Sequence, residues 1–315
     1  MTDARIADAE SDTATAFAAA TAMNRAMPDF EKWSERAEAY RRELRGLAEA
    51  MTADWASALP RQGSSESRQP VFLVGFPRSG TTLLDTLLMG HASLTVLEEK
   101  EMLRRAGKLV GALPGLPDAS AETVNRGRHA YLAELAERAT SAMEGLVIDK
   151  QPLNMVAAPL IHVLFPGAKI IFVQRHPCDA VLSGFMQSFV PNIGMASFLD
   201  LPAAADLYDA AMSVWTAANA VLPLNVHTVL YEELVTDPEP HLRCVLDFLG
   251  LCWDDRVLDH RATAEARGPI MNTSYSQVTD ELSRGAIGRW QRYREQLEPV
   301  LPLLLPWAER LGYGS

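Results

Sequence analysis

The chain has 315 residues, 48% of them hydrophobic and 22% charged, with a formal net charge of −11. This composition is typical of a globular protein, and the acidic balance disfavours nucleic-acid binding, which needs a basic surface. Three widely spaced cysteines (Cys178, Cys244, Cys252) form no metal-binding pattern and fit a reducing compartment. Without a signal-peptide pattern or an apolar run of ~18 residues, we expect a cytoplasmic protein with no membrane span.

Residues 1–58 are rich in Ala, Glu and Arg, which favour helices, and we expect two helices here. Pro60 and the polar residues 61–69 then predict a linker. The chain is therefore expected to consist of an N-terminal helical extension, residues 1–60, and a main domain, residues 70–315. Two roles for the extension stay open, namely packing on the main domain and forming a dimer or partner surface.

The main domain alternates apolar runs with helical segments. Strands are predicted at residues 71–76, 94–97, 146–149, 168–175 and 226–234. Helices are predicted at residues 81–90, 120–144, 153–164, 176–189, 203–221 and 239–249. This alternation predicts an α/β fold of three layers, with a central parallel sheet between helices. Ligands bind such folds at the carboxyl ends of the strands, so the residues that follow each strand are the candidate site residues.

A glycine-rich loop, GFPRSGTT, follows the first strand and opens the next helix. It fits a phosphate-binding loop, except that Thr81 stands where a nucleotide triphosphatase has lysine. Backbone N–H groups and the helix N-terminus still form an anion site. Ser79 and Thr82 add hydroxyl groups, and Arg78 adds a planar cation. The missing lysine argues against Mg²⁺-dependent triphosphate chemistry and favours a nucleotide with a 5′-phosphate.

A second anion site is predicted after the strand at residues 168–175. Arg175 ends that strand, and Ser183 lies eight residues later on the next helix. Both side chains can face one phosphate, although an arginine at a strand end is also compatible with a solvated or ion-paired role. Two anion sites on neighbouring strands favour a nucleotide with phosphates on its 5′ and 3′ sides.

Five segments, in order, resemble sulfotransferases that use 3′-phosphoadenosine 5′-phosphosulfate (PAPS). They are PRSGTTLLDTLLMGHASLTVLEE, IDKQPLN, QRHPCDAVLSGF, VLYEELVTDPE and NTSYSQVTDELSRGAIGRWQRYREQL. The resemblance covers about residues 70–300 and is to bacterial sulfotransferases, often fused to tetratricopeptide repeats, and to tyrosylprotein sulfotransferases. It implies a P-loop-like fold and in-line transfer of a sulfuryl group from PAPS to an acceptor hydroxyl, leaving adenosine 3′,5′-bisphosphate, without a metal.

The resemblance also implies roles for individual residues. Donor binding is expected from Pro77, Arg78, Ser79, Gly80, Thr81, Thr82, Arg175, Ser183, Tyr231, Ser274 and Arg289. Glu99 is expected to be the base that takes the acceptor proton, while Lys150 and Ser274 contact the transferring group. We expect Lys150, from a different strand, to supply the charge that is missing at Thr81.

Several alternatives stay open for these roles. Glu98, His91 and His176 are alternative bases, and one carboxylate of the Glu98–Glu99 pair is a candidate cap for a helix near Lys100. Asp149 is a candidate for orienting Lys150. The sequence also departs from the tyrosylprotein enzymes at Gln187, where they have an arginine, so the 3′-phosphate is expected to depend more on Arg175 and Ser183.

The acceptor is not defined by these motifs. Residues 111–122 and 186–208 are expected to be loops, and their apolar side chains are candidates either for an acceptor pocket or for ordinary packing. The candidate side chains are Phe185, directly before the second of these loops, and Phe189, Met195 and Phe198 within it. A small molecule, sugar, lipid or peptide hydroxyl all remain open as acceptor, and a homodimer is plausible. A P-loop-type small-molecule kinase and a non-catalytic nucleotide-binding protein are the competing functions.

Overall fold

The computed structural model describes the chain except for residues 1, 61–68, 140–144, 260–262, 264–283 and 315. Its centre is a five-stranded sheet with the order β2-β3-β1-β4-β5, in which every pairing is parallel. The strands are β1 (Val71–Gly75), β2 (Leu94–Glu98), β3 (Leu146–Lys150), β4 (Lys169–Gln174) and β5 (Asn225–Leu230). The strand order reverses beside β1, which is where ligands bind in open α/β sheets.

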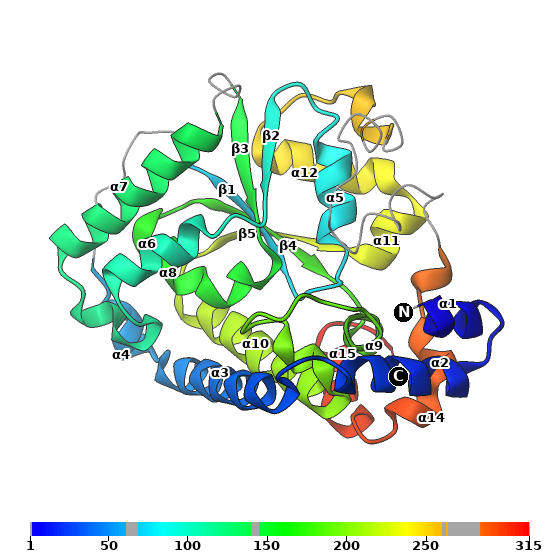
Figure 1. Ribbon diagram of the computed structural model, residues 1–315. Coiled ribbons are helices and arrows are strands. Elements are labelled where there is room, and N and C mark those ends of the chain that lie inside the picture. Colours follow the sequence, from blue (N-terminus) through cyan, green and yellow to red (C-terminus); the bar gives the residue numbers. More distant parts are fainter. Residues whose placement is uncertain (1, 61–68, 140–144, 260–262, 264–283, 315) are drawn as a thin grey trace.

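Helices cover both faces of the sheet, so the predicted three-layer α/β/α fold is confirmed (Figure 1). In β1, Val71 and Leu73 contribute to one core, and Phe72 and Val74 to the other, because successive side chains point to opposite faces. The helices of the first core are α5 (Thr81–Leu88), α11 (Tyr231–Thr236) and α12 (Pro238–Leu249). The helices of the second core include α6 (Met102–Val110), α7 (Ala121–Arg138), α8 (Ala158–Leu164), α9 (Pro177–Phe185), α10 (Leu201–Val221) and α15 (Leu301–Arg310).

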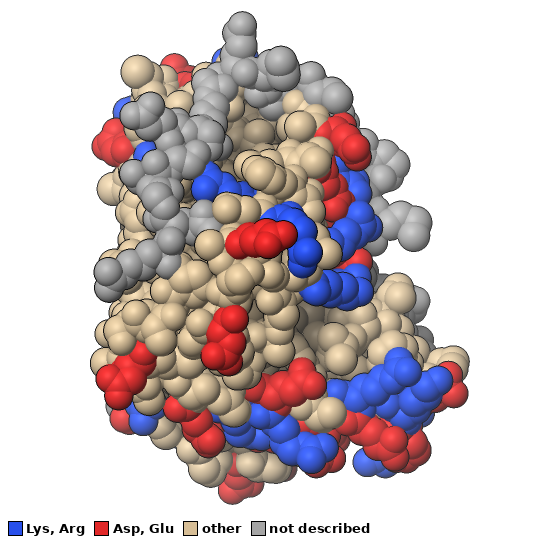
Figure 2. Space-filling view, turned by 90° about the vertical axis from the view of Figure 1, so that its left-hand side faces the viewer, with Lys and Arg blue, Asp and Glu red and all other residues tan. Residues whose placement is uncertain are grey.

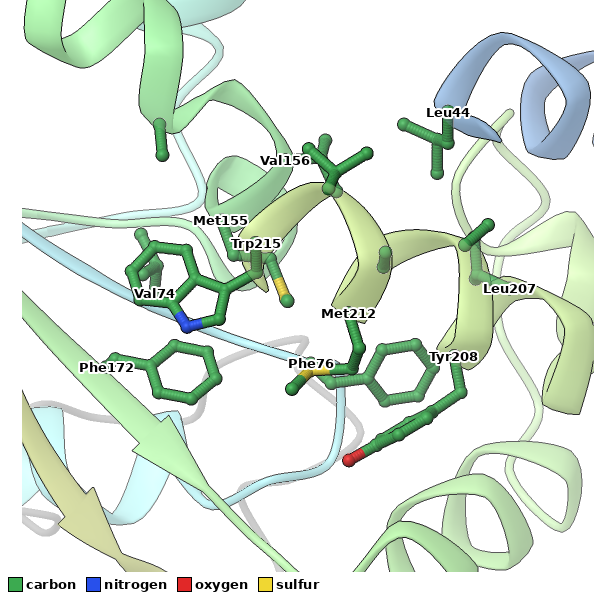
Figure 3. Close-up of a cluster of buried hydrophobic side chains, with 14 of the residues drawn as sticks. Leu44, Val74, Phe76, Met155, Val156, Phe172, Leu207, Tyr208, Met212 and Trp215 are labelled. Atoms are coloured by element: carbon green, nitrogen blue, oxygen red, sulfur yellow. The ribbon is translucent and has the colours of Figure 1, made fainter. Parts of the chain in front are cut away.

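Aromatic side chains join α10 to the middle of the sheet (Figure 3). The indole of Trp215 stacks on Phe172 of β4, with ring centroids 4.4 Å apart. The ring of Tyr208 meets Phe76, just after β1, edge-on at 4.8 Å. These contacts hold the segment that follows β1 against a long helix, and the phosphate-type loop begins there.

The N-terminal segment forms four helices rather than the two that we predicted. They are α1 (Thr2–Ala9), α2 (Thr13–Arg25), α3 (Phe30–Ala50) and α4 (Ala53–Ser57). Two of the breaks have capping residues, since Asp12 accepts from the backbone N–H of Thr15 over 3.0 Å and Thr52 from that of Trp55 over 3.2 Å. In Figure 1, α3 runs beside α10 along the lower edge of the molecule.

Polar contacts fasten these helices to the main domain. The buried amide of Asn24 donates to the carbonyl oxygens of Phe185, at 2.9 Å, and Phe198, at 3.2 Å. On α3, Arg41 donates to Ser197 Oγ over 3.0 Å. The side chains of Phe185 and Phe198 are themselves 3% and 1% exposed and belong to the core. Of the two roles considered for these aromatic side chains, an acceptor pocket or ordinary packing, the structure therefore shows packing in the core.

Several predicted boundaries differ from the structure. The predicted strand at residues 226–234 ends at Leu230, because α11 begins at Tyr231. The helix predicted at residues 153–164 is a 3₁₀ turn, Pro152–Ala157, followed by α8, since prolines stand at the first turn of each. The two expected loops contain further 3₁₀ turns, Leu113–Asp118 and Ala196–Leu199, and α10 already begins at Leu201.

The remaining elements lie towards the C-terminal end of the chain. They are the 3₁₀ turns Asp255–Leu258, Arg284–Ala286 and Arg289–Tyr293, and the short helix α14 (Arg294–Leu297).

Within the described part of the chain, no helix is long and apolar enough to span a membrane. Figure 2 shows one face of the molecule, on which acidic and basic side chains lie side by side over the lower half. The negative net charge is therefore not gathered into one patch on this face.

Candidate active site

The loop after β1 is held in a narrow space. A Cβ atom at Gly75 would lie 2.5 Å from the carbonyl oxygen of Val173 on β4, so only glycine fits there. Ser79 donates its backbone N–H to the carbonyl of Phe76 over 3.1 Å, and Gly80, with φ of 99°, caps α5. The loop turns sharply and leaves the first N–H groups of α5 at the carboxyl end of the sheet, as an anion site requires.

The other loop residues predicted to bind the donor lie in the same turn. Pro77, Thr81 and Thr82 are buried, whereas Arg78 is partly exposed. Arg78 has a φ of 72°, a left-handed conformation that is uncommon for a residue with a side chain. Such a backbone is tolerated where the surrounding structure determines it, and it is frequent at binding sites.

The structure brings the two predicted anion sites together. Arg78 Nε donates to Ser183 Oγ on α9 over 3.2 Å. Arg175, directly after β4, donates to the backbone carbonyl of Arg78 over 2.8 Å and to that of Ala286 over 2.6 Å. The loop after β1 and the residues after β4 therefore form one continuous cationic site, rather than two separate ones.

Tyr231, the first residue of α11, closes this site on one side. A Cβ atom at Gly80 would lie 2.3 Å from its ring, so the ring packs directly on the loop. The guanidinium carbon of Arg175 lies over the same ring, 4.4 Å from its centre. Burial raises the pKa of the Tyr231 hydroxyl. The aromatic ring thus contacts both the loop and the second arginine.

Lys150, the last residue of β3, supplies a buried positive charge. Its side chain has no exposed surface, and its Nζ donates to Thr82 Oγ1 at the start of α5 over 3.3 Å. Nζ also lies 3.0 Å from an oxygen of Glu99 and 3.4 Å from one of Glu98. The carboxylate of Asp85 on α5 lies 3.3 Å away. The lysine from β3 therefore approaches the loop that lacks its own lysine.

Glu98 and Glu99 both contact Lys150, and they differ in exposure. The side chain of Glu99 is 46% exposed, that of Glu98 only 17%. Glu99 has a φ of 49° and donates its backbone N–H to the carbonyl of Lys150 over 2.7 Å. The following helix begins at Met102, with Glu101 at its N-cap, so neither carboxylate occupies the cap position that we considered. Of the two, Glu99 is the more accessible to an incoming molecule.

Asp85 is the site residue that the sequence analysis missed. It lies three residues after Thr82 on α5, and its side chain is completely buried. A signal was present, because a carboxylate in the otherwise apolar run LLDTLL is unfavourable unless a cation neutralises it. The run alone did not indicate which cation would do so.

A model of the sulfotransferase family matches residues 70–255, more than half of the chain. The chain belongs to the sulfotransferase family. The resemblance seen in the sequence motifs is therefore confirmed.

Relatives of this sulfotransferase-family chain occur in animals and bacteria. Protein-tyrosine sulfotransferase 1 of Danio rerio is 26% identical over 266 residues, covering 77% of this chain and 72% of its own. Protein-tyrosine sulfotransferase A of Caenorhabditis elegans is 26% identical over 269 residues, covering 77% and 67%. An uncharacterized protein of Aquifex aeolicus is 29% identical over 251 residues, which cover 76% of this chain and 32% of that protein.

A solved structure shows that the fold is shared. The sulfotransferase domain from the curacin biosynthetic pathway superposes with a TM-score of 0.57 at 20% identity, covering 79% of this chain and 99% of that domain. At this identity the similarity establishes the architecture, and the site has to be argued from the residues of this chain.

Asp149 does not orient Lys150, contrary to our expectation. Its carboxylate accepts a hydrogen bond from the Tyr131 hydroxyl over 2.7 Å on the opposite face of the sheet. The reason is the strand geometry, since neighbouring residues of β3 point to opposite faces. Burial raises the pKa of Asp149 to about 7.

The two alternative histidine bases have other contacts. His91 lies 3.0 Å from the carbonyl oxygen of Cys252 through Nε2, and its Nδ1 accepts from the N–H of Ser93 over 3.0 Å. The ring of His176 stacks on Trp290 at 5.0 Å, and burial lowers its pKa. Both rings therefore support the structure around the site.

Arg289 faces the N-terminal extension. Its guanidinium lies 3.0 Å from the carboxylate of Asp8 on α1 and 3.2 Å from Met186 Sδ at the end of α9. The backbone on either side is fixed by Asp179, which accepts from the N–H groups of Gly288 and Trp290, each over 2.8 Å. The remaining predicted residue, Ser274, lies outside the described residues.

We predict that Gly80→Ala lowers the thermal midpoint of unfolding. The substitution forces a side chain into a left-handed conformation and against the ring of Tyr231. Gly46→Ala on α3 is the matched control, because its Cβ would have nothing within 4 Å. It should stabilise the helix by roughly 0.5–1 kcal/mol. Equal midpoints for both variants in a thermal-shift assay would contradict the described loop packing.

We also predict a pH-dependent effect of Asp149→Asn on stability. The pKa of Asp149 rises from 3.8 to about 7 on folding, so the folded state holds this proton more tightly. The associated stability is present at low pH and is lost as the pH rises towards 7. The thermal midpoint of the variant minus that of the wild type should therefore increase between about pH 5 and about pH 8. A difference independent of pH would show that Asp149 does not titrate in this range.

Proposed function

We propose that the chain transfers a sulfuryl group from PAPS to the hydroxyl group of an acceptor. The observation that carries this proposal is the position of Lys150. It reaches the start of α5 from β3, beside the accessible carboxylate of Glu99. A phosphate-type loop, a cation and a base candidate thus meet at one edge of the sheet, which is what in-line group transfer requires.

The cationic site fits a donor with phosphates on both sides of the nucleoside. Within the described part of the chain, the Nε–H groups of Arg175 and Arg289 are buried and have no hydrogen-bond partner. A buried unpaired donor is costly, and a phosphate oxygen is a strong acceptor. Arg78 and Ser183 join the 5′ loop to the same site. The ring of Tyr231 offers a surface for the adenosine group.

Within this arrangement each residue has one task. The donor supplies the sulfuryl group and its leaving phosphate. The loop N–H groups and Arg78 hold the donor in place, and Lys150 offsets the negative charge that develops at the leaving oxygen. Glu99 takes the proton from the acceptor hydroxyl. Positioning and charge dominate such a reaction, as they do in phosphoryl transfer.

The competing kinase function would need a lysine after Gly80, which this chain lacks. A non-catalytic nucleotide-binding protein would have no need for the accessible carboxylate of Glu99 beside the buried ammonium of Lys150. We therefore favour the enzymatic function over both alternatives.

Apolar side chains near the site indicate the class of acceptor. A Cβ atom at Gly194 would lie 2.6 Å from Leu153, so this loop packs against the 3₁₀ turn that follows β3 and Lys150. The same loop exposes Val190 and Ile193, by 87% and 51%. An apolar edge favours a hydroxyl carried on an aromatic or aliphatic group, and the relatives named protein-tyrosine sulfotransferases make a tyrosine peptide the first acceptor to test.

A panel of acceptors tests the whole proposal. Radiolabelled PAPS is incubated with the protein and a tyrosine peptide, a phenol, a sugar or a lipid alcohol. Transfer of label to one of them supports the proposed function. Absence of transfer to every class, together with phosphoryl transfer from Mg·ATP, would favour the kinase.

We predict that the protein binds adenosine 3′,5′-bisphosphate in preference to ATP, without added Mg²⁺. Arg78→Ala and Arg175→Ala should each weaken this binding by ~1–3 kcal/mol, since each loses charge-assisted contacts. Arg289→Ala should weaken it less, because that guanidinium already contacts Asp8. Arg243→Ala, on the exposed surface of α12, is the control and should bind normally. Unchanged calorimetric affinity in the first two variants would refute the site.

We predict that Glu99→Gln lowers kcat by a factor on the order of 10²–10⁴, because it removes the proton acceptor. Binding of adenosine 3′,5′-bisphosphate should be retained, since Glu99 does not hold the donor. Glu98→Gln should cause a smaller loss, because Glu98 is less exposed. Full activity of Glu99→Gln would assign the role of base to Glu98 or to a histidine.

A further inference from the structure

One buried charge at the site has no role in the proposed reaction so far. Asp85 lies on α5, and neither its side chain nor that of Lys150 has any exposed surface. Its Oδ2 lies 3.3 Å from the ammonium of Lys150, and its Oδ1 lies 3.1 Å from the hydroxyl of Thr86. Oδ2 of Asp85 therefore contacts the ammonium through charge, and Oδ1 faces a hydroxyl that also donates to the carbonyl of Thr82 over 2.8 Å.

The same helix contacts Lys150 twice. Thr82 accepts from Nζ over 3.3 Å at the first turn of α5, and Asp85 lies one turn further on, at the same face. The first turn of this helix also forms part of the phosphate-type loop. The position of the ammonium is therefore tied to the element that binds the donor, although Lys150 itself belongs to β3.

The carboxylates around Lys150 differ in solvent exposure, and this difference indicates different tasks for them. Glu99, 46% exposed, is open to a molecule that reaches this edge of the sheet. When Glu99 turns away from Lys150, the buried cation still needs a counter-ion, and Glu98 at 3.4 Å and Asp85 at 3.3 Å remain beside it. Asp85 is inaccessible to solvent and stays in place, so it can neutralise the ammonium when Glu99 turns to the acceptor.

We propose that Asp85 is a positioning residue for the transfer reaction: it holds the Lys150 ammonium at the start of α5 and serves as its permanent counter-ion. Glu99 is thereby freed to act as the base. This inference rests on the proposed function, because it assigns Asp85 a part in the same reaction. It adds a residue whose role is carried out through Lys150, without contact with the acceptor.

The test is Asp85→Asn, measured with the acceptor that the wild type uses in the panel. We expect kcat to fall at least tenfold, while KM for PAPS does not rise. We also expect the acid limb of the kcat–pH profile to move to lower pH, because the remaining Glu99 carboxylate pairs more firmly with Lys150. Calorimetry should show adenosine 3′,5′-bisphosphate binding at least as tightly as to the wild type, since a negative charge near the anion has been removed.

Two further variants separate positioning from structure. Asp85→Glu, which keeps the charge, should recover part of the lost kcat. Asp149→Asn removes a buried carboxylate beside Lys150 in sequence but on the other face of the sheet, and should leave the acid limb in place. A thermal scan of each variant confirms that it is folded at the assay temperature.

The outcomes are distinct. If wild-type protein transfers sulfuryl groups but Asp85→Asn keeps the wild-type kcat and pH profile, the positioning role is overturned. It is also overturned if Asp85→Asn weakens bisphosphate binding as much as it lowers kcat, or if Asp85→Glu is no better than Asp85→Asn. If the wild-type protein transfers nothing from PAPS to any acceptor, the proposed function itself is overturned.

Discussion

The ammonium of Lys150 has no exposed surface, and the arrangement of the site depends on how this charge is neutralised. Carboxylates reach it from two elements, Glu98 and Glu99 from the end of β2 and Asp85 from α5. A buried cation that loses its counter-ions is strongly destabilising, so these elements have to keep their relative positions. The ion pairs thereby fix the end of β3 against the start of α5, which is the edge where the phosphate-type loop turns.

The backbone at this edge is also under constraint. Arg78 and Glu99, which both have a part in the proposed reaction, adopt left-handed conformations. Such conformations cost of order 1–3 kcal/mol and persist when neighbouring contacts determine them. Here the contacts are the hydrogen bonds from Arg175 to Arg78 and from Glu99 to Lys150. The donor side and the acceptor side are thus shaped before a ligand arrives.

The N-terminal helices take part in the same architecture. They are fastened through Asn24 and Arg41, and α1 places Asp8 against Arg289 and the hydroxyl of Tyr293. Arg289 is one of the cations proposed to bind the donor. The extension is therefore in direct contact with the segment that borders the cationic site.

The pattern of the sequence predicted the fold and indicated which strand ends carry the candidate site residues. Apolar runs between helical segments required a parallel sheet, and the loop before α5, Arg175 and Ser183 follow its strands, so their meeting at one edge was predictable. The sequence motifs also indicated the family, because their residues and their order can be read directly from the chain. The number of helices in the extension was predicted wrongly, because capping residues such as Asp12 divide a segment whose composition is helical throughout.

Only the tertiary structure decided which buried charges face one another. Asp149 and Lys150 are neighbours in sequence, but the pleat of β3 sends one to Tyr131 and the other to α5. Asp85 is far from Lys150 in sequence and reaches it because α5 packs over that face of the sheet. Arg289 meets Asp8 across almost the whole length of the chain. Such pairings depend on register and packing, and neither quantity is a local property of the sequence.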